Sequence, residues 1–171
     1  MVCPEIPEAS TGPVVPPDEG AGGEFALTRW KGHRAAGPEG RIELRVRYVE
    51  TDQMGVVYHA NHLVWCEMGR VDWLDRIGLP YREIERRGLY LPVVEIACRY
   101  LAPAHFDETI AVVTRLVGLG RNRARFGYCL FGPADRRLAE AYSEHVAVDT
   151  SMRSVRLPDW LREKLTPMRP T

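Results

Sequence analysis

The 171-residue sequence lacks the features that would place it in a membrane or in an oxidising compartment. It has only four cysteines, scattered without the CxxC spacing of a zinc ribbon and without a disulfide framework. No apolar run reaches the roughly 18 residues of a membrane span, and the N-terminus has neither the basic region nor the apolar core of a secretory signal. We therefore expect a reduced, cytoplasmic protein without membrane insertion.

The sequence also lacks an excess of charge of either sign. Lys plus Arg and Asp plus Glu number 23 each, so no global field favours nucleic acid or an anionic membrane. The 45% hydrophobic content is typical of a globular protein that buries a core, and the length suggests one domain with an appended tail. An anionic partner would have to be bound locally.

The composition divides the chain into three parts. Residues 1–40 are rich in proline and glycine and cannot bury enough surface to offset chain entropy, which predicts a mostly disordered leader. Residues 41–150 carry the periodic apolar patterns of a folded domain. Residues 151–171 are a C-terminal tail in which 158–165 could form a short helix.

The periodic patterns predict an α+β domain. Alternation of apolar and polar residues, which is typical of half-buried strands, recurs over residues 41–48, 94–100, 110–116, 124–130 and 138–148. A long apolar helix over 61–77 and a short polar helix over 81–87 lie between the first two strands. Turn-like joints between the last three strands favour antiparallel hairpins, and the long helix must then cover one face of the sheet.

The long helix is apolar over a broad arc, but Glu67 and Arg70 fall inside that arc. They are three residues apart and can meet on one helix face, so a buried ion pair is predicted. His62 is expected on the polar side of the helix. Cys66 and Cys98 lie on apolar faces, which favours packing in the core over a nucleophilic role.

The segment YVETDQMGVVYHAN at residues 48–61, followed by a helix with Trp65, Glu67 and Arg70, resembles a known signature. It is similar to that of the hot-dog-fold acyl-CoA thioesterases of the 4-hydroxybenzoyl-CoA thioesterase type, above all to the branch associated with the bacterial Tol-Pal system. The resemblance covers roughly residues 41–150. It implies a five-stranded antiparallel sheet wrapped around one long helix, with two protomers paired edge to edge in a homodimer or tetramer.

The resemblance also implies a reaction, the hydrolysis of an acyl-CoA thioester to a carboxylic acid and free coenzyme A. No cofactor is implied, because coenzyme A is part of the substrate. Hydrolysis needs an attacking oxygen and donors for the oxyanion. Asp52 matches the catalytic carboxylate, as nucleophile or as general base for water. His59 matches a residue beside the thioester, where it could donate to the carbonyl, orient Asp52 or protonate the leaving thiolate.

The start of the long helix is expected to supply the oxyanion donors. Backbone N–H groups near Tyr58 to His62 should lack helical partners and carry the positive end of the helix dipole. Gly55 lets the preceding loop bend and approach the substrate closely. Asn61 is expected to cap the helix, at a position that the family also keeps at the site.

Other assignments stay open at this point. In a second hot-dog branch the catalytic carboxylate is a glutamate on the central helix, so Glu67 is the alternative to Asp52. Arg121 and Arg123, at the start of the fourth predicted strand, could hold the phosphates of coenzyme A, a role carried over by region only. His59 and His62 form an HxxH, but without a second ligand cluster no metal site is expected.

Two other functions compete with acyl-CoA hydrolysis. The acyl group could come from acyl carrier protein instead of coenzyme A. The chain could also be a non-catalytic hot-dog module that binds acyl groups, although such a module has no need of Asp52. A hot-dog dehydratase is less well matched, because the sequence lacks the usual helix motif of that class.

Overall fold

The computed structural model describes residues 33–34 and 38–166, and most of the predicted leader lies outside them. The strands are β1 (His33–Arg34), β2 (Gly40–Arg45), β3 (Val93–Tyr100), β4 (Thr109–Leu119), β5 (Arg123–Phe131) and β6 (Arg137–Val146). The helices are α1 (Asn61–Arg76), α2 (Tyr81–Arg86) and α3 (Asp159–Leu165), with short 3₁₀ turns at Tyr48–Glu50 and Pro133–Asp135. The five strands and two helices predicted for the folded domain are therefore confirmed.

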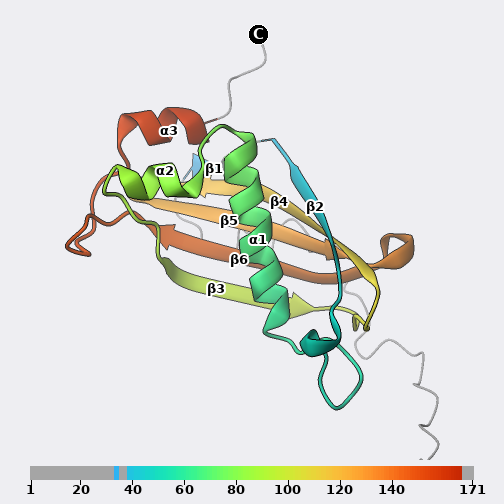
Figure 1. The fold of residues 1–171 in the computed structure, drawn as a ribbon. Helices are drawn as coiled ribbons and strands as arrows, with labels where there is room; N and C mark the ends of the chain where they lie inside the picture. Colours follow the sequence, from blue (N-terminus) through green and yellow to red (C-terminus); the bar gives the residue numbers. More distant parts are fainter. Residues whose placement is uncertain (1–32, 35–37, 167–171) are drawn as a thin grey trace, which may run out of the picture.

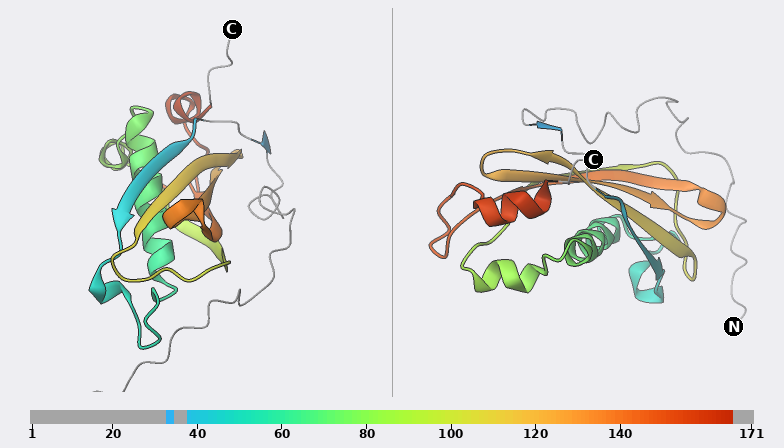
Figure 2. Two further views of the ribbon diagram at one scale, coloured as in Figure 1. Left: turned by 90° about the vertical axis from the view of Figure 1, so that its right-hand side faces the viewer. Right: turned by 90° about the horizontal axis from the view of Figure 1, so that it is seen from above.

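The strands form one antiparallel sheet in the order β1-β4-β5-β6-β3, and β2 also pairs with β4. The sheet curves around α1, which crosses its concave face (Figure 1). Seen from above, α1 and α2 lie on the same side of the sheet (Figure 2). This is the α+β architecture that the sequence predicts, with one long helix packed on an antiparallel sheet.

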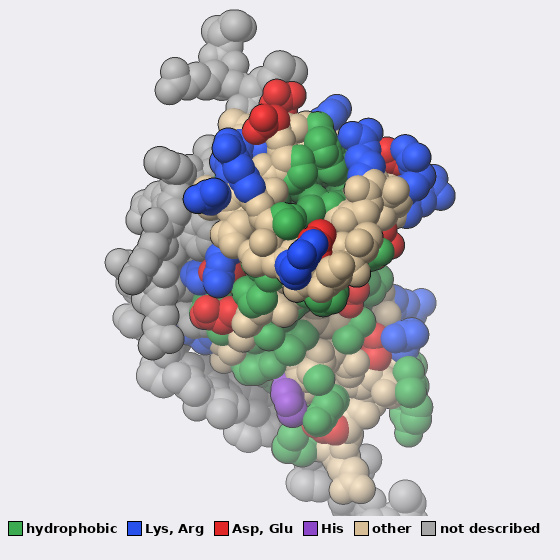
Figure 3. Space-filling view, turned by 90° about the vertical axis from the view of Figure 1, so that its left-hand side faces the viewer, with side chains coloured by type: hydrophobic (Ala, Val, Ile, Leu, Met, Phe, Trp, Pro, Cys, Tyr) green, Lys and Arg blue, Asp and Glu red, His purple; other side chains and the backbone are tan. Residues whose placement is uncertain are grey.

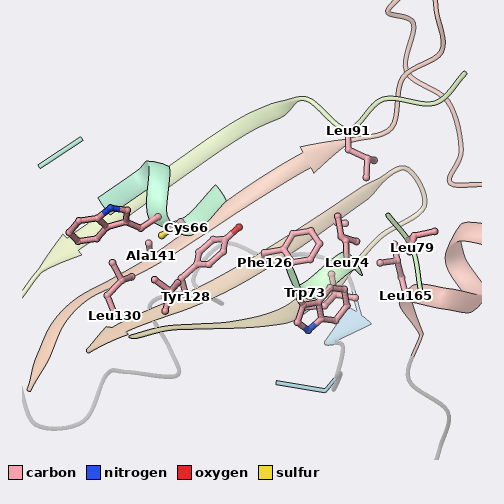
Figure 4. Packing of buried hydrophobic residues seen from close by; sticks show 14 of the residues in the cluster. Cys66, Trp73, Leu74, Leu79, Leu91, Phe126, Tyr128, Leu130, Ala141 and Leu165 are labelled. Atoms are coloured by element: carbon pink, nitrogen blue, oxygen red, sulfur yellow. The ribbon is translucent and has the colours of Figure 1, made fainter. Parts of the chain in front are cut away.

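The core lies between α1 and the sheet. Cys66, Trp73 and Leu74 of α1 lie against Phe126, Tyr128 and Leu130 of β5 (Figure 4), and Trp65 belongs to the same buried cluster. The rings of Trp73 and Phe126 meet edge to face at 5.5 Å. Burying each side chain of this size is worth about 1.5–3 kcal/mol, so the contact of α1 with the sheet provides much of the stability of the domain.

Gly69 sets the closest approach of α1 to the sheet. A Cβ atom on this residue would lie 2.5 Å from Thr114 Oγ1 and 3.0 Å from Val112 Cγ1. The first distance is shorter than real Cβ contacts show and the second is tighter than most of them, so a side chain here would require α1 or the side chains of β4 to shift.

The predicted ion pair between Glu67 and Arg70 is wrong. Glu67 is exposed, whereas Arg70 is only 7% exposed and its guanidinium lies over the ring of Tyr81, 5.2 Å from the centroid. Arg70 has no ion pair with any residue in the described part of the chain. The spacing allowed the pair, but α2 brings Tyr81 against Arg70 while Glu67 faces solvent.

β3 is the outermost strand of the sheet beyond β6 and carries large apolar side chains at its surface. Val93, Val94, Ile96 and Tyr100 are each between 39% and 50% exposed. An apolar strand edge of this kind is usually covered by another chain or element. Within the ranges that the structure describes, no helix is long and apolar enough to cross a membrane.

Candidate active site

The loop before α1 is closed by backbone hydrogen bonds. Thr51 and Val57 form an antiparallel bridge, and the amide of Asp52 donates to the carbonyl of Val56 at 2.9 Å. The amide of Gly55 donates back to the carbonyl of Asp52 at 3.0 Å, and Gly55 adopts φ +73°. This left-handed conformation favours glycine, so Gly55 supplies the bend that the sequence predicts.

Asp52 is half-buried at the start of this loop. Its Oδ1 accepts a hydrogen bond from the amide of Met54 at 2.8 Å, an Asx turn that fixes the side chain. Oδ2 has no partner among the residues that the structure describes. The carboxylate is thus oriented by one oxygen and available through the other.

Glu50 ties the loop to α1, a role that the sequence patterns do not predict. Its carboxylate is 4% exposed and accepts from the amide and guanidinium of Arg47 at 2.8 and 2.9 Å and from Trp65 Nε1 at 3.2 Å. Burial by itself would raise the pKa of Glu50, but the hydrogen bonds from Arg47 and Trp65 outweigh it and hold that pKa below its ordinary value. The three-residue spacing of Arg47 and Glu50 is the feature of the sequence that could have predicted their ion pair.

The carbonyl of Glu50 holds the start of α1. It accepts from the amide of Tyr58 and from Nδ2 of Asn61, each at 2.8 Å. Asn61 is the first helical residue, and no side chain caps α1. The expectation that Asn61 caps the helix is therefore wrong, because its side chain points back to the loop.

Fewer backbone amides are available at the start of α1 than the sequence predicts. The amide of Tyr58 donates to Glu50, and those of Asn61 and His62 donate to the carbonyls of Tyr58 and His59 at 2.9 and 3.3 Å. Within the described part of the chain, only the amides of His59 and Ala60 remain unengaged in this stretch. They are the candidate oxyanion donors.

His59 is exposed and lies against two tyrosines. The centroid of its ring is 4.3 Å from that of Tyr58 and 6.3 Å from that of Tyr100 on β3. The hydroxyl of Tyr100 donates to the carbonyl of His59 at 3.1 Å, so β3 helps to fix the backbone that carries the two unengaged amides. Burial and the nearby thiol of Cys98 raise the pKa of Tyr100 to about 12, which keeps this donor protonated.

His62 is buried, contrary to its predicted place on the polar side of α1. It is 3% exposed, and its ring lies 5.1 Å from those of Trp65 and Tyr100. Neither ring nitrogen has a partner in the residues described. Burial lowers the pKa of His62, so the ring is neutral at pH 7.

The two thiols near this end of α1 are protonated at neutral pH. Burial raises the pKa of Cys66 well above its usual value and that of Cys98 to about 11. A thiol, unlike a thiolate, is a poor nucleophile. The packing role predicted for these residues agrees with this.

The remaining predicted residues lie away from Asp52. Glu67 is on the exposed side of α1, six residues after its start, or ~9 Å along the axis. Arg121 and Arg123 lie where β5 begins, beside the Val146 end of β6, whereas Tyr100 pairs with Ala139 at the other end. Arg121 is exposed, and Arg123 forms an ion pair with Glu144. One protomer therefore does not bring these arginines to the loop of Asp52.

Comparisons with known proteins agree with this architecture. Residues 46–165 match the model of the family described as "Thioesterase-like superfamily". YneP of Bacillus subtilis, provisionally named an acyl-CoA thioesterase, is 40% identical over 123 residues, covering 69% of this chain and 89% of that protein. The chloroplastic acyl-acyl carrier protein thioesterase ATL3 of Arabidopsis thaliana is 32% identical over 135 residues, covering 78% and 71%.

A solved structure extends the match to three dimensions. The DHNA-CoA thioesterase from Staphylococcus aureus superposes with a TM-score of 0.70 at 27% identity. The superposition covers 74% of this chain and 87% of that one.

Proposed function

The chain is a thioester hydrolase that belongs to the thioesterase-like superfamily, and on that premise we propose that Asp52 drives the hydrolysis of an acyl-CoA to a carboxylic acid and free coenzyme A. One observation supports this assignment above all. An oriented carboxylate with one unengaged oxygen and two unengaged amides, those of His59 and Ala60, lie within one hydrogen-bonded loop. An acyl transfer needs these two parts.

The proposed reaction uses Asp52 Oδ2 as general base. It takes a proton from water, and the water oxygen attacks the thioester carbon while the carbonyl oxygen gains negative charge. The amides of His59 and Ala60 donate to that oxyanion, a contribution of about 2.7–4 kcal/mol per donor. The C–S bond then breaks, and the thiolate receives the proton from Asp52 or from the His59 ring. Direct attack by Oδ2, followed by hydrolysis of the resulting anhydride, is the alternative route.

The finer family assignment is part of the proposal. The motif over residues 48–61 supports the 4-hydroxybenzoyl-CoA thioesterase type and, within it, the Tol-Pal-associated branch. The acyl carrier protein alternative also has specific support, because ATL3 of Arabidopsis is named for that substrate.

We also propose that two copies pair antiparallel through β3. In this dimer the apolar edge of one protomer, with Val93, Val94 and Ile96, would be covered by the same edge of the other protomer. Antiparallel pairing would bring the start of β5 in one protomer towards the Tyr100 end of the other, so that Arg121 could reach the phosphates of the partner's coenzyme A. Arg123 is the weaker candidate because it already pairs with Glu144.

The experiment is a thiol-release assay on acyl-CoAs of graded length, aromatic acyl-CoAs and the matching acyl carrier protein thioesters. Wild type is compared with Asp52→Asn and Glu67→Gln. We expect turnover by wild type and Glu67→Gln and a large loss in Asp52→Asn. Loss in a folded Glu67→Gln alone would move the carboxylate to α1, and binding of acyl-CoA without any release would favour the non-catalytic module.

Two further measurements test the dimer and the coenzyme A contact. Ile96→Arg should convert the protein to monomers in sedimentation velocity, since it places a charge in the middle of the β3 edge. Arg121→Ala should raise KM for an acyl-CoA but not for the same acyl group on pantetheine, which lacks the nucleotide. Unchanged sedimentation, or equal KM changes for both substrates, would contradict the respective assignment.

A further inference from the structure

Arg70 is the one strongly buried cation of α1, and its charge has no counterion in the described part of the chain. It is 7% exposed, and its Nη1 is fully buried without a hydrogen-bond acceptor. An arginine does not lose its proton in a protein, and an unpaired buried charge costs several kcal/mol. The contact with Tyr81 at 5.2 Å offsets only about 1–2 kcal/mol of this cost.

The polar groups near Arg70 are already engaged with one another. His145 Nδ1 and the hydroxyl of Tyr81 both donate to the carbonyl of Leu91, at 2.9 and 3.5 Å. Burial and the charge of Arg70 lower the pKa of His145 to about 4, so its ring is neutral at pH 7 and Nε2 must accept. It accepts from Ser143 at 2.8 Å.

This arrangement fixes the direction of the next hydrogen bond. Since Ser143 donates to His145, its oxygen accepts from the hydroxyl of Tyr128 at 2.7 Å. Tyr128 and His145 are thus both held by the hydroxyl of Ser143, and both are neutral. Glu67, one turn away on α1, faces solvent, and Glu144, beside His145, is already paired with Arg123 and Arg125. The described residues around Arg70 therefore provide no anion that pairs with its guanidinium.

Arg70 lies on the same face of α1 as His62, further along the helix from the candidate thioester site. His62, Cys66 and Arg70 are spaced four residues apart and share a helix face. His62 contacts Tyr100, which in turn holds His59. Arg70 follows the first residue of α1 by nine positions, or ~14 Å along the axis, and its side chain leans back towards the N-terminus. Figure 3 shows hydrophobic side chains gathered on one face of the molecule, with a histidine among them.

We propose that Arg70 binds the far end of the acyl group and selects acyl-CoAs of dicarboxylic acids, whose chain ends in a free carboxylate. This inference rests on the proposed function and deepens it by naming the substrate class. The guanidinium fork matches a carboxylate with two hydrogen bonds. The counterion that the free protein lacks would then arrive with the substrate.

The test compares pairs of substrates with equal carbon number, one monocarboxylic and one dicarboxylic acyl-CoA, over a series of lengths. Wild type should prefer the dicarboxylic member at the length that reaches Arg70, by about 10- to 100-fold in kcat/KM, the size expected for a charge-assisted contact. Arg70→Met should abolish this preference and Arg70→Lys retain part of it. Arg82→Met is the matched control, because Arg82 is exposed on the neighbouring helix α2.

A binding measurement separates this inference from the reaction. The free dicarboxylic acid should raise Tm in wild type and Arg82→Met but not in Arg70→Met, whether or not any thioester is cleaved. Hydrolysis without a dicarboxylic preference would overturn the role of Arg70 and leave the proposed function intact. If Arg70→Met keeps the substrate preference but sediments as a monomer, the counterion of Arg70 is a carboxylate of a second copy of the chain. That result would also overturn the proposed role of Arg70. A shift in Tm without hydrolysis would support Arg70 and contradict the reaction.

Discussion

Replacing Glu50 by Gln is predicted to loosen the loop of Asp52 and to change the pH dependence of stability. Glu50 accepts three hydrogen bonds with its carboxylate, two from Arg47 and one from Trp65. A Gln amide nitrogen cannot accept, so at least one of these donors loses its partner at a cost of about 1–3 kcal/mol, and the charge-assisted bond is weakened as well. We expect a total loss of about 2–4 kcal/mol, or roughly 6–16 °C in Tm for a domain of this size.

The sign of the pH effect follows from the lowered pKa of Glu50. The folded state favours the carboxylate, so its contribution is present above the ordinary value of 4.5 and is lost as pH falls through the folded value. Urea unfolding of wild type and Glu50→Gln should therefore differ fully above about pH 5 and converge at lower pH. The exposed Glu43→Gln serves as control. A difference that stays constant from pH 7 to pH 3 would refute the role given to the Glu50 charge.

Three further substitutions test other contacts. Gly69→Ala should destabilise the domain by about 1–3 kcal/mol in urea unfolding, because its Cβ would collide with Thr114 Oγ1. Adding Thr114→Ser, which keeps the hydroxyl, should not restore the stability. Adding Thr114→Ala, which removes the hydroxyl, should recover part of it. Tyr100→Phe should lower the free energy of unfolding by about 0.5–1.5 kcal/mol and also lower kcat, since the carbonyl of His59 loses its donor. An unchanged kcat would show that the Tyr100 hydroxyl of β3 does not support the site. His62→Phe should reduce the loss of stability between pH 7 and pH 5, because the pKa of the buried His62 is lowered and the unfolded chain takes up its proton near pH 6.5; equal slopes in the two proteins would contradict this.

The sequence was sufficient for the elements because their patterns are local. Strand alternation and the stop signals at Gly78 and Pro80 depend on neighbours in the chain, and they predicted β2 to β6, α1 and α2. The motif at residues 48–61 likewise identified the loop that carries Asp52, and Gly55 takes the bent conformation expected of it.

The errors concern contacts between segments far apart in the sequence. Spacing along α1 shows only the helix face and so predicts that Arg70 pairs with Glu67, whereas Tyr81 of α2 makes the contact. The polarity of His62 predicts an exposed position, but Tyr100 of β3 packs against its ring. Asn61 is a typical capping residue, but its side chain donates to the carbonyl of Glu50 instead. Side-chain polarity alone predicts none of these tertiary contacts.

The proposed role of Asp52 in the reaction is tested most directly by kcat of Asp52→Asn on the best acyl-CoA substrate. Asn retains an oxygen that can accept from the amide of Met54, so the loop should keep its shape, which matching Tm values would verify. Losing a general base costs about 10²- to 10⁴-fold. We predict a fall of that size in kcat with an intact fold. A kcat within a few-fold of wild type would show that Asp52 is not the general base.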